Sequence, residues 1–409
     1  MRILFATPVY PFPPHRTGAH RRFHSLLKHL TANHRSDLLL LDGEDITEER
    51  AGEDLPGLAG FERVAWKVPH SRFLSRYFHL FWRYDIPAFK RALQNRLREE
   101  DYDLVYAFWG GMALHGGLLR RTAAVIDTVD AHSLYLERRL DRANTLRERW
   151  RLRHEIRQAH RFERRFFPLF DGWFTVAPRD TERIREGCPG LSVWTIPVAV
   201  DHEYFKVSRK PNLPPTIIFS GKMDFPDNAD AAVLLGKEIL PRIQRAIPET
   251  RLILAGGSPI DSVRALASRP GITVTGFVED LRSPYAEASV MVSPLISGSG
   301  IKCKVMEALC METPVVLTSL AAEGFEGTAP EGVIIRDDPE LIAEATIDLL
   351  RNPAKAAGLG RDGRRYVIEN FSEDRVCKRA EEILIQLAGG GKKTLTRSPT
   401  ASDLSQRER

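Results

Sequence analysis

Short apolar runs alternate with helical patterns along most of this chain, and this alternation constrains the fold more than any other feature. The first run, Ile3 to Ala6, leads through a proline-rich loop into a helical pattern over 19–30 whose apolar side chains share one face. A second run, Leu38 to Leu41, follows directly. Strand, helix and strand in this order predict a βαβ unit and therefore a parallel sheet.

The same alternation recurs in two series. In the first half we predict further buried strands at 104–107, 123–126, 173–176 and 193–196, and in the second half at 216–219, 251–255, 272–275, 290–292, 314–317 and 332–335. The stretch between them, 197–215, is rich in proline and charge, as domain boundaries often are. We therefore predict two α/β domains, residues 1–198 and 199–385, and a flexible basic tail over 388–409 that lacks periodicity.

Composition excludes several classes of protein. Hydrophobic residues make up 43% and charged residues 28% of the 409 residues, which excludes collagen-like and wholly disordered chains. No window approaches the roughly 18 uninterrupted apolar residues of a membrane span. The first apolar run ends before Pro8 and is too short for a secretory signal, and the four cysteines show no zinc-site spacing. We expect a cytoplasmic protein.

The segment 293–316 carries the strongest chemical signal, with the sequence S-P-L-I-S-G-S-G-I-K-C-K-V-M-E-A-L-C-M-E-T-P-V-V. Gly298, Ser299 and Gly300 form a loop that leads from a predicted strand into a predicted helix. Glycines allow a tight turn and a close approach of a ligand to the backbone. The N-terminus of the helix then offers free N–H groups to an anion.

Three charged side chains of that helix extend the prediction. Lys302 and Lys304 lie in its first turn, where cations oppose the helix dipole unless an anion is bound. Glu307 lies one turn further along and is suited to accept hydrogen bonds from a ribose diol. The site therefore fits a nucleoside diphosphate. The alternatives are solvated lysines on a surface turn and a weak ion pair between Glu307 and Lys304.

The run E-A-L-C-M-E-T-P-V-V resembles the E-A-M-A-x-G-x-P-V-V segment of the family 4 glycosyltransferases, which have the GT-B fold. The resemblance continues upstream through 197–205, 251–258, 271–280 and 285–294, and more weakly through the N-terminal P-P-x-x-x-G loop and the Phe-Ser pair at 371–372. Within this family the chain looks most like the sugar transferases of exopolysaccharide and exosortase systems. The resemblance implies two Rossmann-like domains with parallel sheets that face each other across a cleft.

The resemblance also implies an activity, a retaining transfer of a sugar from a nucleotide diphosphate to an acceptor hydroxyl. The N-terminal domain would hold the acceptor and the C-terminal domain the nucleotide sugar, which is a co-substrate, so no cofactor and no metal is expected. Glu307 matches the glutamate that holds the ribose, and Gly300 with its neighbours matches the loop at the donor sugar and diphosphate. Phe277 and Val278 match the stretch that reads the base, and Gly18 matches the glycine loop that closes over the donor.

The chain departs from the family pattern at two positions. Ser299 stands where the family usually has the first of two glutamates, and Asp227 stands where it usually has a phosphate-binding lysine. Lys222 retains the other expected cation. We infer that Lys302 and Lys304 take over part of the phosphate binding, and we expect Lys304 to stabilise the leaving diphosphate as a catalytic residue.

In the first domain, the sequence A-V-I-D-T-V-D-A-H-S places Asp130 and His132 just past a predicted strand, where ligands bind in open α/β sheets. Family members often have a histidine here that contacts the donor sugar, and either residue could match it. The alternative is a helix N-cap formed by Asp130 or Ser133. The D-x-D at 101–103 resembles a metal motif, but a lone D-x-D is too common to predict a metal.

Arginine is concentrated in one region. Residues 138–167 hold eleven arginines against four acidic residues, and apolar side chains recur there near helical spacing. Residues 72–84 repeat the pattern on a smaller scale. Such helices fit an anionic membrane surface on the inner face of the membrane, or form an ordinary solvated face over the core. No nucleic-acid-binding module is present, so nucleic acid is not expected as a partner.

The leading hypothesis is thus a retaining glycosyltransferase that uses a nucleotide-sugar donor and a saccharide or lipid-linked acceptor in bacterial polysaccharide or glycolipid synthesis. A nucleotide-sugar epimerase is the second hypothesis, but it would need additional acid–base residues at the sugar. The third is a non-catalytic subunit that binds nucleotide sugar, which the residues Ser299 and Asp227 keep open. No dinucleotide-binding G-x-G-x-x-G follows a predicted strand, which disfavours a nicotinamide enzyme.

Overall fold

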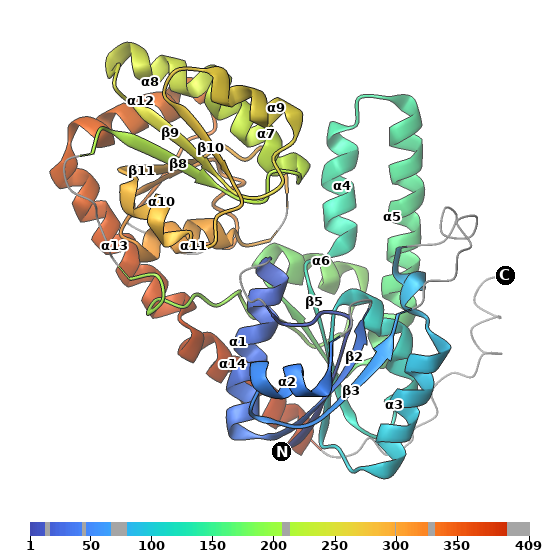
Figure 1. Cartoon of the computed structure of the whole chain (residues 1–409). Helices are drawn as coiled ribbons and strands as arrows, with labels where there is room; N and C mark the ends of the chain where they lie inside the picture. The colour runs from blue at the N-terminus through green and yellow to red at the C-terminus, as the bar shows by residue number, and fades with distance from the viewer. Residues whose placement is uncertain are drawn as a thin grey trace.

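The computed structural model describes residues 1–12, 17–42, 46–66, 80–206, 213–298, 300–325 and 332–390. Within these residues each half of the chain forms one parallel sheet (Figure 1). The N-terminal sheet has the strand order β3 (Leu58–Ala65), β2 (Arg35–Asp42), β1 (Arg2–Thr7), β4 (Leu104–Phe108), β5 (Ala123–Val129), β6 (Gly172–Thr175) and β7 (Val193–Thr195). The C-terminal sheet has the order β10 (Ile272–Gly276), β9 (Arg251–Ala255), β8 (Thr216–Ser220), β11 (Val290–Ser293), β12 (Val315–Leu317) and β13 (Val333–Ile335).

In each sheet the first strand of the domain, β1 or β8, lies in the interior, and later strands are added outward on both sides of it. This is the doubly wound arrangement of Rossmann-like folds. All of the predicted strands are present, which confirms the predicted two-domain α/β class. The prediction missed β3, an edge strand whose side chains are mostly half-exposed.

Helices connect the strands of each sheet. The N-terminal domain contains α1 (Gly18–Asn33), α2 (Glu48–Asp54), η1 (Leu80–Tyr84), α3 (Pro87–Glu99), η2 (Gly110–Leu118), α4 (His132–Arg142), α5 (Leu146–Phe166), η3 (Phe167–Leu169) and α6 (Pro178–Gly187). The second half of the chain contains α7 (Pro226–Leu234), η4 (Leu235–Ile239), α8 (Leu240–Ala246), α9 (Asp261–Arg264), η5 (Ala265–Ser268), α10 (Arg282–Glu287), α11 (Cys303–Cys310), α12 (Pro339–Arg351), α13 (Pro353–Phe371) and α14 (Glu373–Gly389).

The strands of the N-terminal sheet are buried on both faces. Along β1, Ile3 and Phe5 pack into the cluster that includes α1 and α14, whereas Leu4 and Ala6 pack into the opposite cluster with α3 and η2. Strands covered on both sides need apolar residues at successive positions, which is why they read as continuous apolar runs in the sequence.

The chain crosses between the domains twice. The first crossing follows β7, and the second is the passage from α13 to α14 (Figure 1). The two crossings lie side by side, because the N–H of Val200 donates to the carbonyl of Phe371 over 2.9 Å. Helix α14 packs on the N-terminal sheet through Val376, Ala380 and Leu384. The last helix of the predicted 199–385 segment therefore belongs in space to the N-terminal domain.

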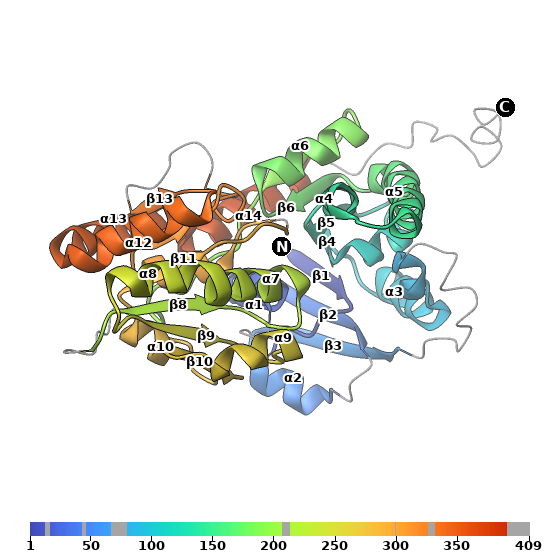
Figure 2. The ribbon, with the colours of Figure 1, turned by 90° about the horizontal axis from the view of Figure 1, so that it is seen from above.

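Helices α4 and α5 form an antiparallel hairpin at the edge of the N-terminal domain, at the end away from α13 (Figure 2). The hairpin has a small apolar core of its own, which includes Leu136, Ala143, Leu152 and Ala159. In the part of the chain that the structure describes, no helix combines the length and the apolar character needed to cross a membrane.

Candidate functional site

The predicted phosphate loop lies between β11 and α11, at the carboxyl edge of the C-terminal sheet. Gly298 and Gly300 adopt φ values of +114° and +69°, which residues other than glycine rarely adopt. Helix α11 begins at Cys303. The free N–H groups of its first turn therefore lie beside this loop. Ser299 lies outside the described residues.

Lys304 is a buried cation at this edge. Its Nζ donates to the side-chain carbonyl of Asn228 and lies 4.3 Å from the ring centre of Phe219. It is also close enough to Gly221 that a Cβ there would lie 2.9 Å from Nζ. Burial, together with the nearby charge of Lys302, lowers the pKa of Lys304 to about 7. Within the described ranges no carboxylate forms an ion pair with this ammonium group.

Lys302 has a different environment. Its Nζ donates to the carbonyl of Gly300 over 2.6 Å. Burial lowers the pKa of Lys302, while the charges of Glu323 and Asp130 act to raise it. The two lysines, predicted as a pair, therefore face different groups: Lys304 faces the end of β8, and Lys302 faces acidic residues at the domain interface.

The structure also shows the surroundings of Asp227, where the chain departs from the family pattern. The Asp227 carboxylate accepts a hydrogen bond from the hydroxyl of Ser297. The next residue, Asn228, is the one that binds Lys304. The Lys304 ammonium therefore lies beside the segment that lacks the expected lysine. Lys222 is half-exposed and pairs with Asp224 over 3.0 Å.

Glu307 is buried and is held by the N-terminal domain. Its Oε1 accepts a hydrogen bond of 2.5 Å from Nη1 of Arg21, and the exposed fractions of the two residues are 4% and 7%. Arg21 comes from the first turn of α1, and its guanidinium also lies over the ring of Phe205. Sequence reasoning missed Arg21, because nothing local links it to a glutamate 286 positions away. In this arrangement the carboxylate that was predicted to bind ribose forms an ion pair between the domains.

Asp130 comes from the N-terminal domain and reaches the phosphate loop. A Cβ at Gly300 would overlap the Asp130 carboxylate, so the two residues are in direct contact. The turn that presents Asp130 contains Val129 at φ +68°, a strained value for a β-branched residue. Burial raises the pKa of Asp130 and also that of Asp180, which the sequence analysis did not single out.

His132 does not share this position. It is the first residue of α4, and its ring lies against the rings of Phe81 and Tyr135, with centroids 5.3 and 6.2 Å away. Burial lowers its pKa. The capping alternative was wrong for Asp130 and Ser133, because the N-cap of α4 is Ala131, without a side-chain capping bond. Instead, Asp180 accepts the N–H of Ala131 over 2.8 Å.

A third interdomain contact involves the hairpin. Arg138 of α4 donates to both carboxylate oxygens of Glu323, over 2.6 and 2.8 Å, and to the carbonyl of Gly298 over 2.8 Å. Gly18, at the start of α1, faces α11: a Cβ there would lie 3.1 Å from Sγ of Cys303. Part of the loop before Gly18, residues 13–16, lies outside the described residues.

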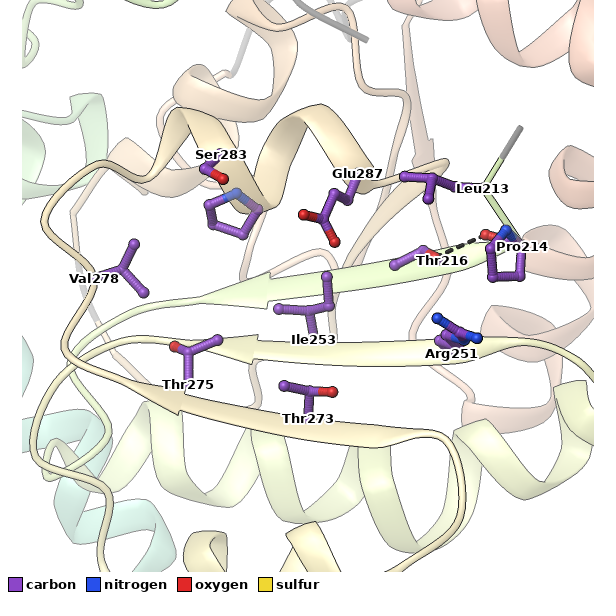
Figure 3. A pocket seen from close by; sticks show the side chains of 11 residues that line it. Leu213, Pro214, Thr216, Arg251, Ile253, Thr273, Thr275, Val278, Ser283 and Glu287 are labelled. Atoms are coloured by element: carbon purple, nitrogen blue, oxygen red, sulfur yellow. Dashed lines mark hydrogen bonds between the residues drawn. The ribbon is translucent and has the colours of Figure 1, made fainter. Parts of the chain in front are cut away.

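The predicted base-reading residues follow β10. Phe277 is 83% exposed, so its ring is accessible to a flat ligand. Val278 lines a hollow of about 300 Å³ on the face of β8, β9 and β10, closed on one side by α10 (Figure 3). The hollow extends to Pro214 and Arg251 at the amino ends of the strands, so most of it lies away from the phosphate loop. It was not predicted from the sequence.

The D-x-D motif precedes β4, at the amino edge of the N-terminal sheet. Asp103 accepts the N–H of Arg2 there over 2.8 Å. Across the described ranges no group of three or more His, Cys, Asp or Glu side chains is arranged to hold a metal ion. The absence of a metal from the reaction stays a prediction.

Two parallel-sheet Rossmann-like domains, in contact through the phosphate loop, define the GT-B class of fold. Solved structures share it. Sucrose-phosphate synthase from Thermosynechococcus elongatus superposes with a TM-score of 0.71 at 16% identity, covering 96% of this chain and 100% of that one. HepE from Anabaena, solved in complex with UDP, superposes with a TM-score of 0.68 at 13% identity, covering 94% and 100%.

Family models identify both halves of the chain. Residues 16–204 match Glycosyltransferase Family 4, and residues 214–352 match Glycosyl transferases group 1. The chain thus consists of a family 4 glycosyltransferase domain followed by a group 1 glycosyl transferase domain, which confirms the family resemblance. The more specific likeness to exopolysaccharide and exosortase transferases stays a prediction.

One curated relative is similar to part of the chain. The GDP-mannose-dependent alpha-(1-6)-phosphatidylinositol monomannoside mannosyltransferase of Mycolicibacterium smegmatis is 29% identical over 161 residues, which are 36% of this chain and 42% of that protein. This chain spans only about two fifths of the length of such curated relatives, 42% and 43%.

The ion pair between Arg21 and Glu307 predicts a non-additive pair of mutations. Arg21→Leu should lower the free energy of unfolding by about 3–5 kcal/mol, because it leaves a buried carboxylate without a partner. Adding Glu307→Leu should recover most of this loss, and urea denaturation followed by circular dichroism measures both. Arg361→Leu, at an exposed position of α13, is the control and should change stability by less than about 0.5 kcal/mol. A double variant as unstable as Arg21→Leu would contradict the assignment.

The backbone conformation of the phosphate loop predicts that replacing a loop glycine and replacing a helical glycine have opposite effects on stability. Gly300→Ala should destabilise the protein by about 1–2 kcal/mol from backbone strain alone, and more from the overlap with Asp130. Gly358→Ala in α13 should be neutral or stabilising, because a Cβ there meets no atom within 4 Å and the residue is helical. Differential scanning calorimetry compares the two melting temperatures. Equal effects would mean that the loop conformation is not specified by Gly300.

Proposed function

We propose that this chain is a retaining glycosyltransferase that moves a sugar from a nucleoside diphosphate to an acceptor hydroxyl. The observation that carries the proposal is Lys304: a buried ammonium group at the carboxyl end of β8, hydrogen-bonded to a neutral carboxamide and adjacent to the first turn of α11. A buried lysine keeps its charge only with compensating negative charge, and without it the pKa falls, as it does for Lys304. A diphosphate supplies that charge, and the free N–H groups of α11 supply additional donors.

The proposed chemistry uses residues from both domains. The acceptor oxygen bonds to the anomeric carbon on the face that the diphosphate leaves, the bond from that carbon to the diphosphate oxygen breaks, and the acceptor proton passes to the departing diphosphate. Lys304 and Lys222 neutralise the leaving group, a contribution of roughly 3–4 kcal/mol for a well-placed donor. Asp130 is in contact with Gly300, which supports a proposed role beside the donor sugar.

Glu307 would bind the ribose, and this role requires a rearrangement. Arg21 occupies Oε1 of Glu307, and the pair is buried between the domains. A nucleotide therefore reaches the carboxylate when the two domains separate or Arg21 turns away. A carboxylate can accept several hydrogen bonds, so Arg21 and a ribose hydroxyl can share it once the nucleotide is in place.

The acceptor class is proposed from the relatives. The mycobacterial relative acts on a phosphatidylinositol mannoside by its name, and one structural neighbour is a glycosyltransferase involved in lipopolysaccharide biosynthesis. We therefore propose a saccharide or lipid-linked acceptor in polysaccharide or glycolipid synthesis, presented at the inner face of a membrane.

Nucleotide binding predicts a selective thermal shift. One of UDP, GDP, ADP and dTDP, or its sugar, should stabilise the protein by about 2.7 kcal/mol at 100 times its Kd. Glu307→Gln should lose most of this ligand-dependent shift, measured against its own unliganded melting temperature. Glu344→Gln, at an exposed position of α12, should keep it. A nucleotide shift without turnover on any acceptor would favour the non-catalytic subunit, and no shift at all would contradict the proposed donor site.

Lys304 predicts a pH-dependent affinity. Above pH 7 the unliganded lysine is largely neutral, and it must take up a proton to pair with the diphosphate, so affinity should fall up to about tenfold per pH unit between pH 7.5 and 9. Calorimetry in buffers of different ionisation enthalpy detects the proton uptake. Lys304→Met should lower turnover at least about tenfold and remove the proton uptake. A wild-type affinity that is independent of pH would exclude Lys304 from the phosphate site.

A further inference from the structure

One face of α5 is exposed along the whole helix and changes character along its length. The residues of this face recur every three or four positions: Leu146, Trp150, Arg153, Arg157, Arg161 and Arg164. Leu146 and Trp150, at the start of the helix, are 87% and 69% exposed. Four exposed arginines follow them. We call these six residues the docking face; at 1.5 Å per residue it is about 27 Å long.

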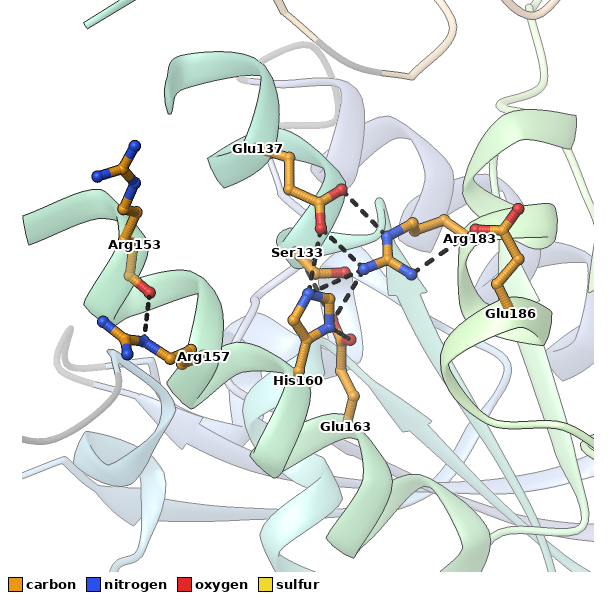
Figure 4. A network of polar contacts seen from close by, with 8 residues as sticks. All are labelled: Ser133, Glu137, Arg153, Arg157, His160, Glu163, Arg183 and Glu186. Atoms are coloured by element: carbon orange, nitrogen blue, oxygen red, sulfur yellow. Dashed lines mark hydrogen bonds and ion pairs between the residues drawn. The ribbon is translucent and has the colours of Figure 1, made fainter. Parts of the chain in front are cut away.

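The opposite side of α5 is fully engaged. Leu152 and Ala159 pack into the small core of the hairpin. Polar contacts then fix the base of the hairpin: His160 lies 3.1 Å from Glu137 of α4, and Arg183 of α6 donates to the same carboxylate over 2.8 Å (Figure 4). The docking face therefore has a fixed orientation away from the fold.

The docking face carries the positive charges of four arginines. Arg157 donates to the backbone carbonyl of Arg153, and Figure 4 shows both residues turned away from the polar network. Among the described residues, none of the four arginines of this face forms an ion pair with a carboxylate. Figure 1 places α4 between α5 and the C-terminal domain, so α5 is the outer helix of the hairpin.

The chemistry of this face identifies its partner. Two large exposed apolar side chains at one end favour a partner with an apolar interior, and tryptophan is typical of the boundary between lipid and water. Arginine side chains bury their stems and keep their charge at the level of the headgroups. Nucleic acid would bind the arginines but would offer no apolar environment to Leu146. We propose that α5 docks on an anionic phospholipid surface through the docking face, with Leu146 and Trp150 inserted deepest.

The position of the hairpin connects this surface to the rest of the molecule. Arg138, in the second half of α4, is bonded to Glu323 and to the carbonyl of Gly298. A membrane-bound hairpin would therefore hold the phosphate loop at a fixed place relative to the bilayer. The proposal rests on the proposed function only for its purpose, to bring the site near a lipid-linked acceptor, and not for the binding itself.

The test is sedimentation of the full chain with vesicles. Vesicles of phosphatidylcholine containing about one third phosphatidylglycerol should bind the protein, vesicles of phosphatidylcholine alone should bind it far less, and salt near 1 M should weaken binding. Arg153→Glu with Arg157→Glu should lower the partition coefficient at least about 25-fold, at about fivefold per lost charge. The matched charge control is Arg361→Glu with Arg379→Glu, two exposed arginines of α13 and α14, which should bind like the wild type.

The apolar end has its own readout. Lipids brominated on the acyl chain should quench tryptophan fluorescence on binding, and Trp150→Phe should remove most of this quenching while leaving the circular dichroism spectrum unchanged. Trp150→Ser should weaken vesicle binding about tenfold, whereas Leu341→Ser, at an exposed position of α12, should not.

Three outcomes would overturn the proposal. They are equal binding to both kinds of vesicle, binding that is insensitive to the docking-face variants, and a docking face that binds polynucleotides or a second copy of the chain but no vesicles. Nucleotide-induced stabilisation is measured without lipid, so the proposed donor site can stand or fall independently of this result.

Discussion

Two adjacent arginines of α1 determine how the domains are joined. Arg21 pairs with Glu307 of the C-terminal domain, and Arg22 pairs with Asp127 at 2.7 Å inside the N-terminal domain. Arg22 also donates to the carbonyls of Ile196 and Pro197, where the chain leaves the N-terminal sheet. All four charged side chains are buried, so each charge needs its partner to offset desolvation. One turn of one helix thus ties together the N-terminal core, the first crossing and the helix of the candidate site.

The fold was predictable because buried parallel strands need apolar residues on both faces. The edge strand β3 was not predicted, because its sequence, L-A-G-F-E-R-V-A, mixes polar and apolar residues. Most of its side chains are half-exposed. The candidate site was predictable only where one segment carries it. The glycines of the phosphate loop, Lys304 and Glu307 lie within ten residues of one another. Arg21 and Asp180 were not predictable, since their roles depend on contacts between distant segments.

Lys302 and Lys304 show that side-chain contacts are difficult to predict even for residues that are close in the sequence. Lys302 is the N-cap of α11 and has an extended backbone, whereas Lys304 lies within the helix, so their side chains reach different groups. Only the observed start of α11 decides which one faces Asn228. The altered position at Asp227 then gains a physical explanation. Coulomb energy depends on where a charge lies and not on the helix that carries it, so Lys304 of α11 can place a cation beside the segment where the sequence pattern predicts a lysine and Asp227 stands instead.

The burial that lowers the pKa of Lys304 also strengthens its electrostatic interaction with an anion, because both effects follow from the low local dielectric. The same reasoning applies to Glu307, whose Oε1 is bonded to Arg21 in a buried ion pair. A nucleotide that binds Glu307 must favour an arrangement in which that ion pair is opened or shared, and it can shift the domains only by its difference in affinity between the two arrangements. If Glu307 binds the donor as proposed, donor binding and domain arrangement are linked through one carboxylate, and a variant of Arg21 that opens the ion pair but keeps Glu307 should make the site easier to occupy.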